Sequence, residues 1–452
     1  MTDRARPEFR SAASDWFGQP RGLTILFLTE TWEKFSYYGM RSLLVYYMTR
    51  QLMLGQQRAS MVYGLYTALA YLTPIVGGAL ADRWLGRRRA VIIGGSVMAV
   101  GHFMMAFPQL FYPALATIAA GNGLFLPSLP GQVGALYDAA DPRRRSAYSV
   151  YYVGINLGAF LAPLACGGVG ELAGWHWGFA LAGVGMLAGL TIYVAGGRWL
   201  PAQPPRPVAA AVAGPRTGAT DLRTSLGLML AVGLAVVVLR GAYEQIGNTV
   251  ALWTAARVDR GVGAGLAIPM TWFQALNPLL IFVLTPPLVR HWRRRAARGR
   301  EPGSAVKMAT GAAIMAGAYL LLAAVSQAAQ GGQASWIWLA LFTAVLTAGE
   351  LFVLPVGLGL FARLAPAALA ATAIAGWFLA TFAGNLLAGA LGTLFTGLGE
   401  ARFFLAMAGL AGAAAVMLLA LARPVARAET ALAASPDPDL NPAPPPVLRQ
   451  AV

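Results

Sequence analysis

Twelve long apolar runs, separated by short polar or basic turns, limit how this chain of 452 residues can fold. Each run has about the length that an α-helix needs to cross a bilayer, which is roughly 20 residues. Only 12% of the residues are charged, whereas soluble domains carry about 25%. The sequence therefore predicts an all-α polytopic membrane protein with twelve transmembrane helices. The runs cover residues 23–48, 60–81, 90–107, 109–136, 147–170, 175–197, 225–255, 266–289, 305–327, 336–362, 370–397 and 401–422.

The first run, residues 23–48, is unusual because it places four charged side chains in an otherwise apolar segment. An ionisable group at membrane depth is costly, and it normally faces the bundle interior or a water-filled cavity, where it serves a function. Spacings of three and four residues put most of the polar side chains of this run on one helical face. We predict that this face is a functional site. Its residues are Glu30, Glu33, Lys34, Tyr37, Tyr38 and Arg41.

Basic residues fall in short clusters between the apolar runs, and they predict the orientation of the chain. The formal net charge of +16 is also typical of nucleic-acid binding, but the clustering in alternate turns follows the positive-inside rule. We therefore expect a cell inner membrane, both termini in the cytoplasm, the lipid bilayer as partner and no nucleic-acid partner. The clusters assigned to the cytoplasm are Arg83 and Arg87 to Arg89, Arg143 to Arg145, and Arg290, Arg293 to Arg295, Arg298 and Arg300. The opposite turns carry Arg50, Arg58, Arg257, Arg260 and Arg402.

A segment rich in Pro, Ala and Gly separates the sixth and seventh runs and reads as a linker. Both six-run halves place a basic turn after their second run, as duplicated six-helix repeats do. The linker is too short to hold an extra pair of helices. The predicted units are a cytoplasmic N-terminal segment (1–22), an N-terminal six-helix bundle (23–197), the cytoplasmic linker (198–224), a C-terminal six-helix bundle (225–422) and a disordered cytoplasmic tail (423–452).

The remaining reactive residues do not form a pattern that indicates an enzyme or a metal site. Cys166 is the only cysteine, so an intrachain disulfide is excluded. The three histidines, His102, His176 and His291, lack the mutual spacing of metal ligands. We find no nucleophile with a base partner and no phosphate loop, and no signal peptide. We expect neither enzymatic activity, nor a metal or cofactor, nor an obligate protein partner.

Motifs along nearly the whole chain are similar to those of the proton-dependent oligopeptide transporter family of the major facilitator superfamily. The blocks occur in family order from the first run to the eleventh. They are Glu30-x-x-Glu33-Lys34-Phe35-Ser36-Tyr37-Tyr38-Gly39, Tyr71-Leu-Thr-Pro-x-x-Gly77-Gly78-x-x-Ala81-Asp82-Arg83, Tyr151-Tyr-x-x-Ile155-Asn156-x-Gly158, Tyr243-Glu244-Gln245, Trp272-Phe-Gln-x-Leu-Asn277-Pro278, Gly349-Glu350-Leu-x-x-x-Pro355-Val-Gly357, Gly376-Trp377-Phe-Leu and Gly384-Asn385. The resemblance implies a major facilitator fold, with two six-helix halves around a central site.

Two departures from the family pattern affect residues that the family uses for coupling and binding. The first-helix motif has Lys34 where the family usually has arginine. In the fourth run, Leu126 stands where family members commonly carry a lysine. The resemblance implies that this lysine helps to hold the substrate carboxylate, so Leu126 is expected to weaken that grip. Arg240, in the seventh run, is a candidate for the missing cation.

The resemblance implies that Glu30, Glu33 and Lys34 form a proton-coupling cluster, in which a carboxylate gains or loses a proton as its pairing changes. The alternative is a static salt-bridged cluster that only fixes the packing of the first helix. Arg41 and Glu244 would form a gate between the two halves by the same resemblance. Alternatively, Glu244 pairs locally with Arg240, which lies four residues earlier on the same helical face.

A zwitterionic peptide needs a cation for its carboxylate and an anion for its amine. Arg41 suits the first role through bidentate pairing, and Glu350 suits the second. Other residues match family positions that line the cavity, although aromatic residues in membrane helices also serve as packing or interfacial anchors. The predicted substrate-binding set is Tyr37, Tyr38, Arg41, Tyr71, Asn156, Arg240, Asn277, Glu350 and Trp377.

Asp82 and Arg83 resemble the cytoplasmic latch of the superfamily, and a solvated basic loop is the alternative. The function predicted for the whole chain is secondary active transport by alternating access, with proton-coupled uptake of di- or tripeptides or peptide-like molecules. The alternative within transporters is a divergent member that moves another amine, acid or conjugate, without proton coupling. A non-transporting receptor that keeps the fold, and a membrane enzyme, are the alternatives from other classes.

Overall fold

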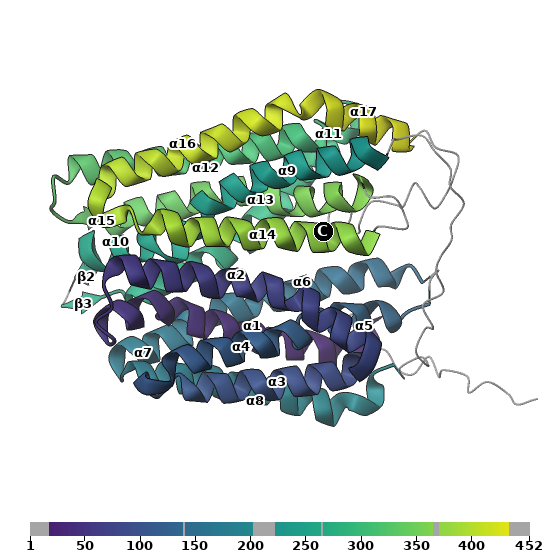
Figure 1. Cartoon of the computed structure of the whole chain (residues 1–452), viewed down its shortest axis with the longest axis horizontal. Helices are drawn as coiled ribbons and strands as arrows, with labels where there is room; N and C mark the ends of the chain where they lie inside the picture. The colour runs from purple at the N-terminus through teal and green to yellow at the C-terminus, as the bar shows by residue number, and fades with distance from the viewer. Residues whose placement is uncertain (1–17, 139–140, 202–221, 264, 365–369, 434–452) are drawn as a thin grey trace, which may run out of the picture.

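The computed structural model describes residues 18–138, 141–201, 222–263, 265–364 and 370–433. Long helices pack side by side along one common direction (Figure 1), and a view at right angles separates them into two bundles. The first bundle consists of α1 (Arg21–Arg50), α2 (Gln56–Leu80), η2 (Ala81–Leu85), α3 (Arg87–Met104), η3 (Pro108–Leu110), α4 (Phe111–Phe125), α5 (Pro130–Ala135), α6 (Arg143–Ala162), η4 (Pro163–Gly167), α7 (Gly168–Leu172), α8 (Trp175–Ala195) and η5 (Gly196–Trp199).

The second bundle follows the predicted linker and includes four very short strands. Its elements are α9 (Leu222–Tyr243), η6 (Glu244–Gly247), α10 (Thr249–Arg257), β1 (Val258–Asp259), β2 (Gly261–Gly263), β3 (Leu266–Ala267), η7 (Met270–Ala275), α11 (Leu276–Ala297), α12 (Ser304–Ala328), β4 (Ala334–Ser335), α13 (Trp336–Leu364), α14 (Ala370–Gly392), α15 (Phe395–Leu398), α16 (Glu400–Ala420) and α17 (Ala422–Ala433). Strands β2 and β3 form an antiparallel hairpin, and β1 pairs with β4 in parallel.

Ten helical segments in the described part of the chain are long and apolar enough to cross a membrane. Helices α1, of 30 residues, and α3, of 18 residues, are also long enough to cross a bilayer, and each carries at least three charged residues. In a membrane, charged residues are tolerated where they face the bundle interior or lie at the helix ends. With these two helices, the residues that the structure describes contain twelve spans, as predicted. The twelve spans are α1, α2 with η2, α3, η3 to α5, α6 to α7, α8 with η5, α9 to α10, η7 with α11, α12, α13, α14 and α16.

The helical fold is as predicted, and strands of two or three residues pair in the turns around β1 to β4. The structure corrects the sequence prediction in two places. The seventh run is not one continuous helix: it breaks at Glu244–Gly247 into a short 3₁₀ turn. The predicted disordered tail begins too early, because the chain is helical from Ala422 to Ala433.

Helix α17 is ordered because it has both an apolar face and a polar anchor. Val425 and Ala428 are buried against the bundle, at the three-residue spacing of one helical face. The Glu429 carboxylate accepts a hydrogen bond from Ser304 Oγ at 2.6 Å and pairs with Arg363 at 2.8 Å. The predicted linker (198–224) and the rest of the predicted tail lie largely on residues 202–221 and 434–452, outside the described residues. The division into units therefore stays a prediction there.

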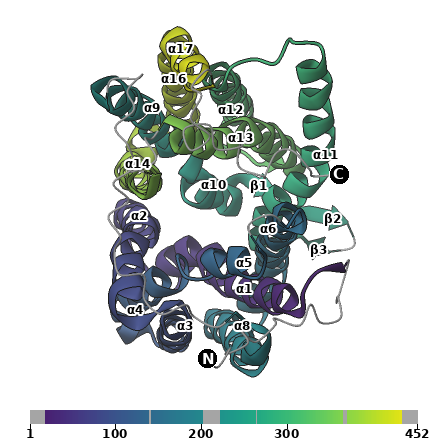
Figure 2. The same ribbon diagram turned by 90° about the vertical axis from the view of Figure 1, so that its right-hand side faces the viewer.

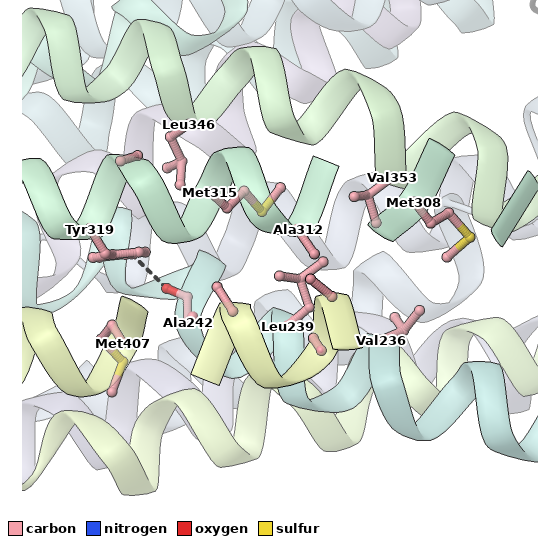
Figure 3. Packing of buried hydrophobic residues seen from close by; sticks show 14 of the residues in the cluster. Val236, Leu239, Ala242, Met308, Ala312, Met315, Tyr319, Leu346, Val353 and Met407 are labelled. Carbon is pink, nitrogen blue, oxygen red and sulfur yellow. Dashed lines mark hydrogen bonds between the residues drawn. The ribbon is translucent and has the colours of Figure 1, made fainter. Parts of the chain in front are cut away.

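The core of the second bundle combines small and aliphatic side chains with aromatic ones such as Phe342, Phe403 and Phe404. Figure 3 shows the part of it that lies around α12. Helix α12 lies at its centre and packs against α13 and α16. Tyr319 of α12 is fully buried, and its hydroxyl donates a hydrogen bond to the carbonyl oxygen of Ala242 at 2.6 Å. That carbonyl lies in the last turn of α9, where the helix leaves carbonyl groups without an internal donor. Tyr319 thus stabilises α9 directly before the break at Glu244.

The backbones of the two bundles come into direct contact where α2 meets α14. A Cβ atom on Gly64 would lie 2.3 Å from the Cα atom of Gly389, so only glycine permits this contact. Small residues let helix backbones touch in a membrane, where apolar side chains gain little from leaving lipid. Helices α2 and α14 therefore form one of the seams along which the two bundles meet.

The molecule has two distinct ends. The hairpin end, on the left in Figure 1, carries the β2–β3 hairpin, α7, α10 and α15. The basic end, on the right, carries α5, α17 and the arginines that start α3. Hydrogen bonds between the bundles run from mid-helix to the hairpin end: Gln56 to the Gly392 carbonyl, Ser60 to Asn248, Asn385 to the Thr67 carbonyl, and Gln274 to the Ser42 carbonyl. The structure is therefore held closed at the hairpin end.

Candidate functional site

The charged face of α1 contains a compact cluster, called here the first-helix cluster, formed by Glu30, Glu33 and Lys34. The Lys34 Nζ atom lies 3.3 Å from Glu30 Oε1 and 2.7 Å from Glu33 Oε2. Glu30 also accepts a hydrogen bond from the Tyr151 hydroxyl of α6 at 2.5 Å. Because Tyr151 comes from another helix, the cluster ties α1 to α6. The structure brings all three predicted residues together.

The two carboxylates of this cluster have different surroundings. Glu33 is completely buried, and neither of its oxygens has a hydrogen-bond partner of good geometry among the described residues. Its contact is the ion pair with the Lys34 ammonium at 2.7 Å. Glu30, by contrast, holds the Tyr151 hydroxyl. A buried charge is costly unless it is paired, and among the described residues Lys34 is the cation that pairs with Glu33.

Glu244 is paired with two arginines at once, and we call Arg41, Glu244 and Arg240 the charge triad. The Arg41 Nη2 atom lies 2.6 Å from Glu244 Oε2, across the two bundles. The Arg240 Nη2 atom lies 2.5 Å from Glu244 Oε1, within the second bundle. The predicted gate pair and the local alternative therefore coexist, each using one carboxylate oxygen. Two guanidinium groups on one carboxylate leave the triad with an excess positive charge.

The break in the seventh span allows this arrangement. Glu244 is the first residue of η6, where the helix gives way to a 3₁₀ turn. A Cβ atom on Gly247 would lie 2.0 Å from the Tyr63 hydroxyl oxygen, so glycine is required for Tyr63 to approach. Tyr63 in turn accepts a hydrogen bond from Arg41 Nε at 2.9 Å. The phenol orients the guanidinium toward Glu244.

Arg240 has further contacts that hold it in the second bundle. Its Nη2 atom donates to Asn385 Oδ1 at 3.1 Å, and its guanidinium lies over the rings of Tyr71 and Tyr243. Its Nε atom is buried without a hydrogen-bond partner among the described residues. Leu126, the residue in place of the family lysine, follows α4 and is partly exposed.

Glu350 of α13 is hydrogen-bonded by neutral donors and lies within electrostatic range of Arg240. Asn277 Nδ2 donates to Glu350 Oε2 at 2.7 Å and also to Thr347 Oγ1 at 2.9 Å. Tyr243 also hydrogen-bonds to Glu350. No cation forms a salt bridge with Glu350 in the part of the chain that the structure describes. This carboxylate is oriented by neutral donors and remains available to a positive group.

The site as a whole contains four buried glutamates but three basic side chains. If every group were ionised, one negative charge would remain uncompensated, which is expensive at membrane depth. One bound proton, or one positive group of a ligand, removes that excess. The charges are Glu30, Glu33, Glu244 and Glu350 against Lys34, Arg41 and Arg240.

The aromatic and amide residues of the predicted substrate-binding set occupy different places. Tyr38 is partly exposed and lies within electrostatic range of Lys34, Arg41 and Glu350. Tyr37 stacks on Tyr66, with ring centroids 6.4 Å apart. Tyr38 is therefore the phenol of the set that lies between the first-helix cluster, the charge triad and Glu350.

Tyr71 lies beside the Arg240 guanidinium, and Asn156 and Trp377 are held by hydrogen bonding or packing. The Tyr71 ring meets Phe378 across the bundles, at 6.1 Å between centroids. Asn156 is buried and donates to the Tyr152 carbonyl oxygen. Trp377 packs on Gly357 and Phe361, which favours the packing alternative for this residue. Their predicted roles in binding stay predictions.

At the basic end, Asp82 and Arg83 are exposed residues of η2. The Asp82 carboxylate lies 3.9 Å from Arg87 Nε, and both side chains are about half exposed or more, at 70% and 49%. Such a surface pair contributes little to stability. The geometry favours the solvated-loop alternative, and the latch stays a prediction.

Three residues of the site were not in the predicted set. Tyr63 and Tyr151 orient Arg41 and Glu30, and Asn385 orients Arg240. Tyr151 and Asn385 lie in the motif blocks quoted from the sequence, and this position could have identified them as site residues. Tyr63 lies outside those blocks, and its role follows from its contacts with Arg41 and Gly247 in the structure. No group of three or more metal-ligating side chains occurs among the described residues.

Comparisons with known proteins agree with this geometry. The POT family model matches residues 88–213 and 217–404. A di-/tripeptide transporter of Lactococcus lactis subsp. cremoris is 32% identical over 482 residues, covering 91% of this chain and 96% of the relative. The peptide transporter YePEPT of Yersinia enterocolitica subsp. palearctica is 30% identical, covering 83% of this chain and 88% of the relative.

Solved structures show the same fold. The crystal structure of the peptide transporter POT in complex with sulfate has a TM-score of 0.85 and 32% identity, covering 92% of this chain and 98% of that one. A POT family transporter in complex with 5-aminolevulinic acid has a TM-score of 0.83 and 25% identity, covering 91% and 98%. These similarities confirm the predicted fold, in which two six-helix halves form one transporter.

Proposed function

This chain belongs to the POT family, and from that membership we propose that it carries di- and tripeptides or peptide-like molecules inward with protons. It is a multi-pass membrane transporter that works by alternating access. The proposal includes a cell inner membrane, both termini in the cytoplasm, protons as the coupling ion, and neither a cofactor nor an obligate protein partner. No enzymatic activity is part of it. In this orientation the basic end faces the cytoplasm, as the positive-inside rule requires.

The observation that carries the substrate proposal is the separation of charge between the triad and Glu350. The charge triad has an excess positive charge and suits a carboxylate, whereas Glu350 is held by neutral donors and suits an amine. Tyr38 lies within electrostatic range of both Arg41 and Glu350. A short peptide carries its two opposite charges a few ångströms apart, and can therefore interact with both groups at once.

Uptake of labelled dialanine into proteoliposomes tests this proposal. One set of vesicles receives an inward proton gradient, and the other is kept at equal pH with unlabelled dialanine inside. We expect accumulation in the first set and exchange in the second. Exchange without accumulation would retain the peptide site and reject the proton coupling. Inactivity in both sets would reject peptides as substrates.

A second candidate is transport of a smaller amine-containing acid, because such a compound also carries one amine and one carboxylate for the same two groups. One structural neighbour was crystallised with 5-aminolevulinic acid. Competition by 5-aminolevulinic acid against dialanine distinguishes the candidates, because a compound that inhibits far better than dipeptides would favour the smaller substrate.

We expect Arg240→Ala to weaken transport of dialanine more than transport of dialanine amide. If Arg240 supplies the missing cation, its loss removes an attraction to the free carboxylate, which the amide lacks. An effect of about tenfold on KM would match the loss of one charge-assisted hydrogen bond. The measurement is uptake kinetics for both compounds in proteoliposomes. Equal loss for the two compounds would show that Arg240 only maintains the charge triad.

A further inference from the structure

Glu171 of α7 connects the two bundles at the hairpin end, away from the charged site. Its Oε2 atom accepts a hydrogen bond from the Met270 backbone N–H at 2.9 Å. Its Oε1 atom accepts from the Thr271 N–H at 2.8 Å and from Thr271 Oγ1 at 2.6 Å. The Arg260 guanidinium lies 4.0 Å from Oε2. One carboxylate of the first bundle thus accepts three hydrogen bonds from the second.

These hydrogen bonds cap the N-terminus of η7, which continues into α11. The first N–H groups of a helix lack internal acceptors and normally receive them from the side chain of the preceding residue. In η7 that residue is Pro269, which has no side chain able to cap. Glu171 supplies the cap from the other bundle, and its negative charge suits the positive end of the helix dipole. The eighth span therefore depends on the first bundle for its N-terminal cap.

The surrounding contact is too tight for this seam to open without breaking these bonds. A Cβ atom on Gly167 would lie 2.3 Å from Thr271 Oγ1. Trp272 Nε1 donates to the Leu164 carbonyl oxygen at 3.1 Å. Glu171 and its partners lie where η4 and α7 meet η7, and none of its hydrogen bonds in the described residues involves the charge triad. This seam is separate from the site that would bind substrate.

We propose that Glu171 is a positioning residue that latches the hairpin end and sets the equilibrium between its closed and open states. The carboxylate gains three charge-assisted hydrogen bonds in the closed state and water in the open state, so the contact is reversible. None of these hydrogen bonds involves the charge triad, so they stabilise the closed state whether or not substrate is bound. The inference rests on alternating access, which is part of the proposed function, and not on the identity of the substrate.

Distances between spin labels test the latch without any substrate. Labels replace Gln57 of α2 and Gln327 of α12, two exposed glutamines on regular helices of different bundles near the hairpin end. The native Cys166 is buried and stays unlabelled. The matched control is Glu400→Gln, which removes a carboxylate that pairs with Arg257 inside the second bundle at the same end.

In Glu171→Gln we expect the ratio of long to short distances to rise on the order of tenfold. Thr271→Val removes one of the three hydrogen bonds and should shift the ratio in the same direction by less. Glu400→Gln should leave the distribution as in the wild type. A Glu171→Gln distribution that matches the wild type would overturn the proposal, and so would an equal shift in Glu400→Gln, which would indicate general loosening.

Discussion

A Glu33→Gln variant is expected to lose proton-driven accumulation of dialanine while exchange at equal pH continues. Glu33 is completely buried, and it has no hydrogen-bond partner of good geometry among the described residues. It also competes with Glu30 for the single ammonium of Lys34. Glutamine has the shape of the protonated acid but cannot release a proton. The variant should therefore complete the steps of exchange and fail at the step that needs deprotonation.

The measurement is accumulation against a dialanine gradient, with counterflow in the same vesicles as the internal control. Loss of accumulation should exceed about tenfold, while exchange stays within a few-fold of the wild type. Glu30→Gln is the matched control, because it removes a carboxylate from the same cluster. It should impair both modes, since Glu30 holds Tyr151 and thereby ties α1 to α6. Full accumulation in Glu33→Gln would support the static alternative for the first-helix cluster.

The sequence predicted the spans and the charged face of α1 because both depend on local patterns. Apolar length indicates a transmembrane helix, and spacings of three and four indicate a shared face. Lys34 does lie beside Glu30 and Glu33, and Arg41 does reach Glu244. The choice between Arg41 and Arg240 as the partner of Glu244 could not be made from sequence, because it depends on how two bundles pack.

The misses have physical causes of the same kind. The apolar pattern of the seventh run does not indicate the break at Glu244. The glycine in that break, Gly247, is needed because Tyr63 of the other bundle packs against it, and this contact is not visible in the sequence. The tail was predicted to be disordered from its composition, yet Val425 and Glu429 dock its first turns on α12 and α13. Glu171 lies in the short helix α7, and two of its three hydrogen bonds come from backbone N–H groups, which carry no sequence signal.

A Glu244→Gln variant is expected to lose most transport and to open the hairpin end. The change leaves the guanidinium groups of Arg41 and Arg240 close together without their shared carboxylate. Removing one partner of a buried ion pair costs about 3–5 kcal/mol, which corresponds to a factor of at least about 100 in a conformational equilibrium. Arg41 belongs to the first bundle and Arg240 to the second, so separation of the bundles relieves the repulsion between the two cations. The closed state should therefore be depleted.

A second substitution distinguishes this electrostatic account from a simple structural defect. In Arg240→Met with Glu244→Gln, one cation is removed together with the acid, so the like-charge repulsion disappears. The spin-label pair at Gln57 and Gln327 should then show more of the closed state than Glu244→Gln alone. Arg240→Met by itself should keep the hairpin end closed, since the Arg41 to Glu244 contact across the bundles remains. If Arg240→Met opened that end as far as Glu244→Gln does, the contact that closes it would be the local pair, and Arg41 would not be the gate.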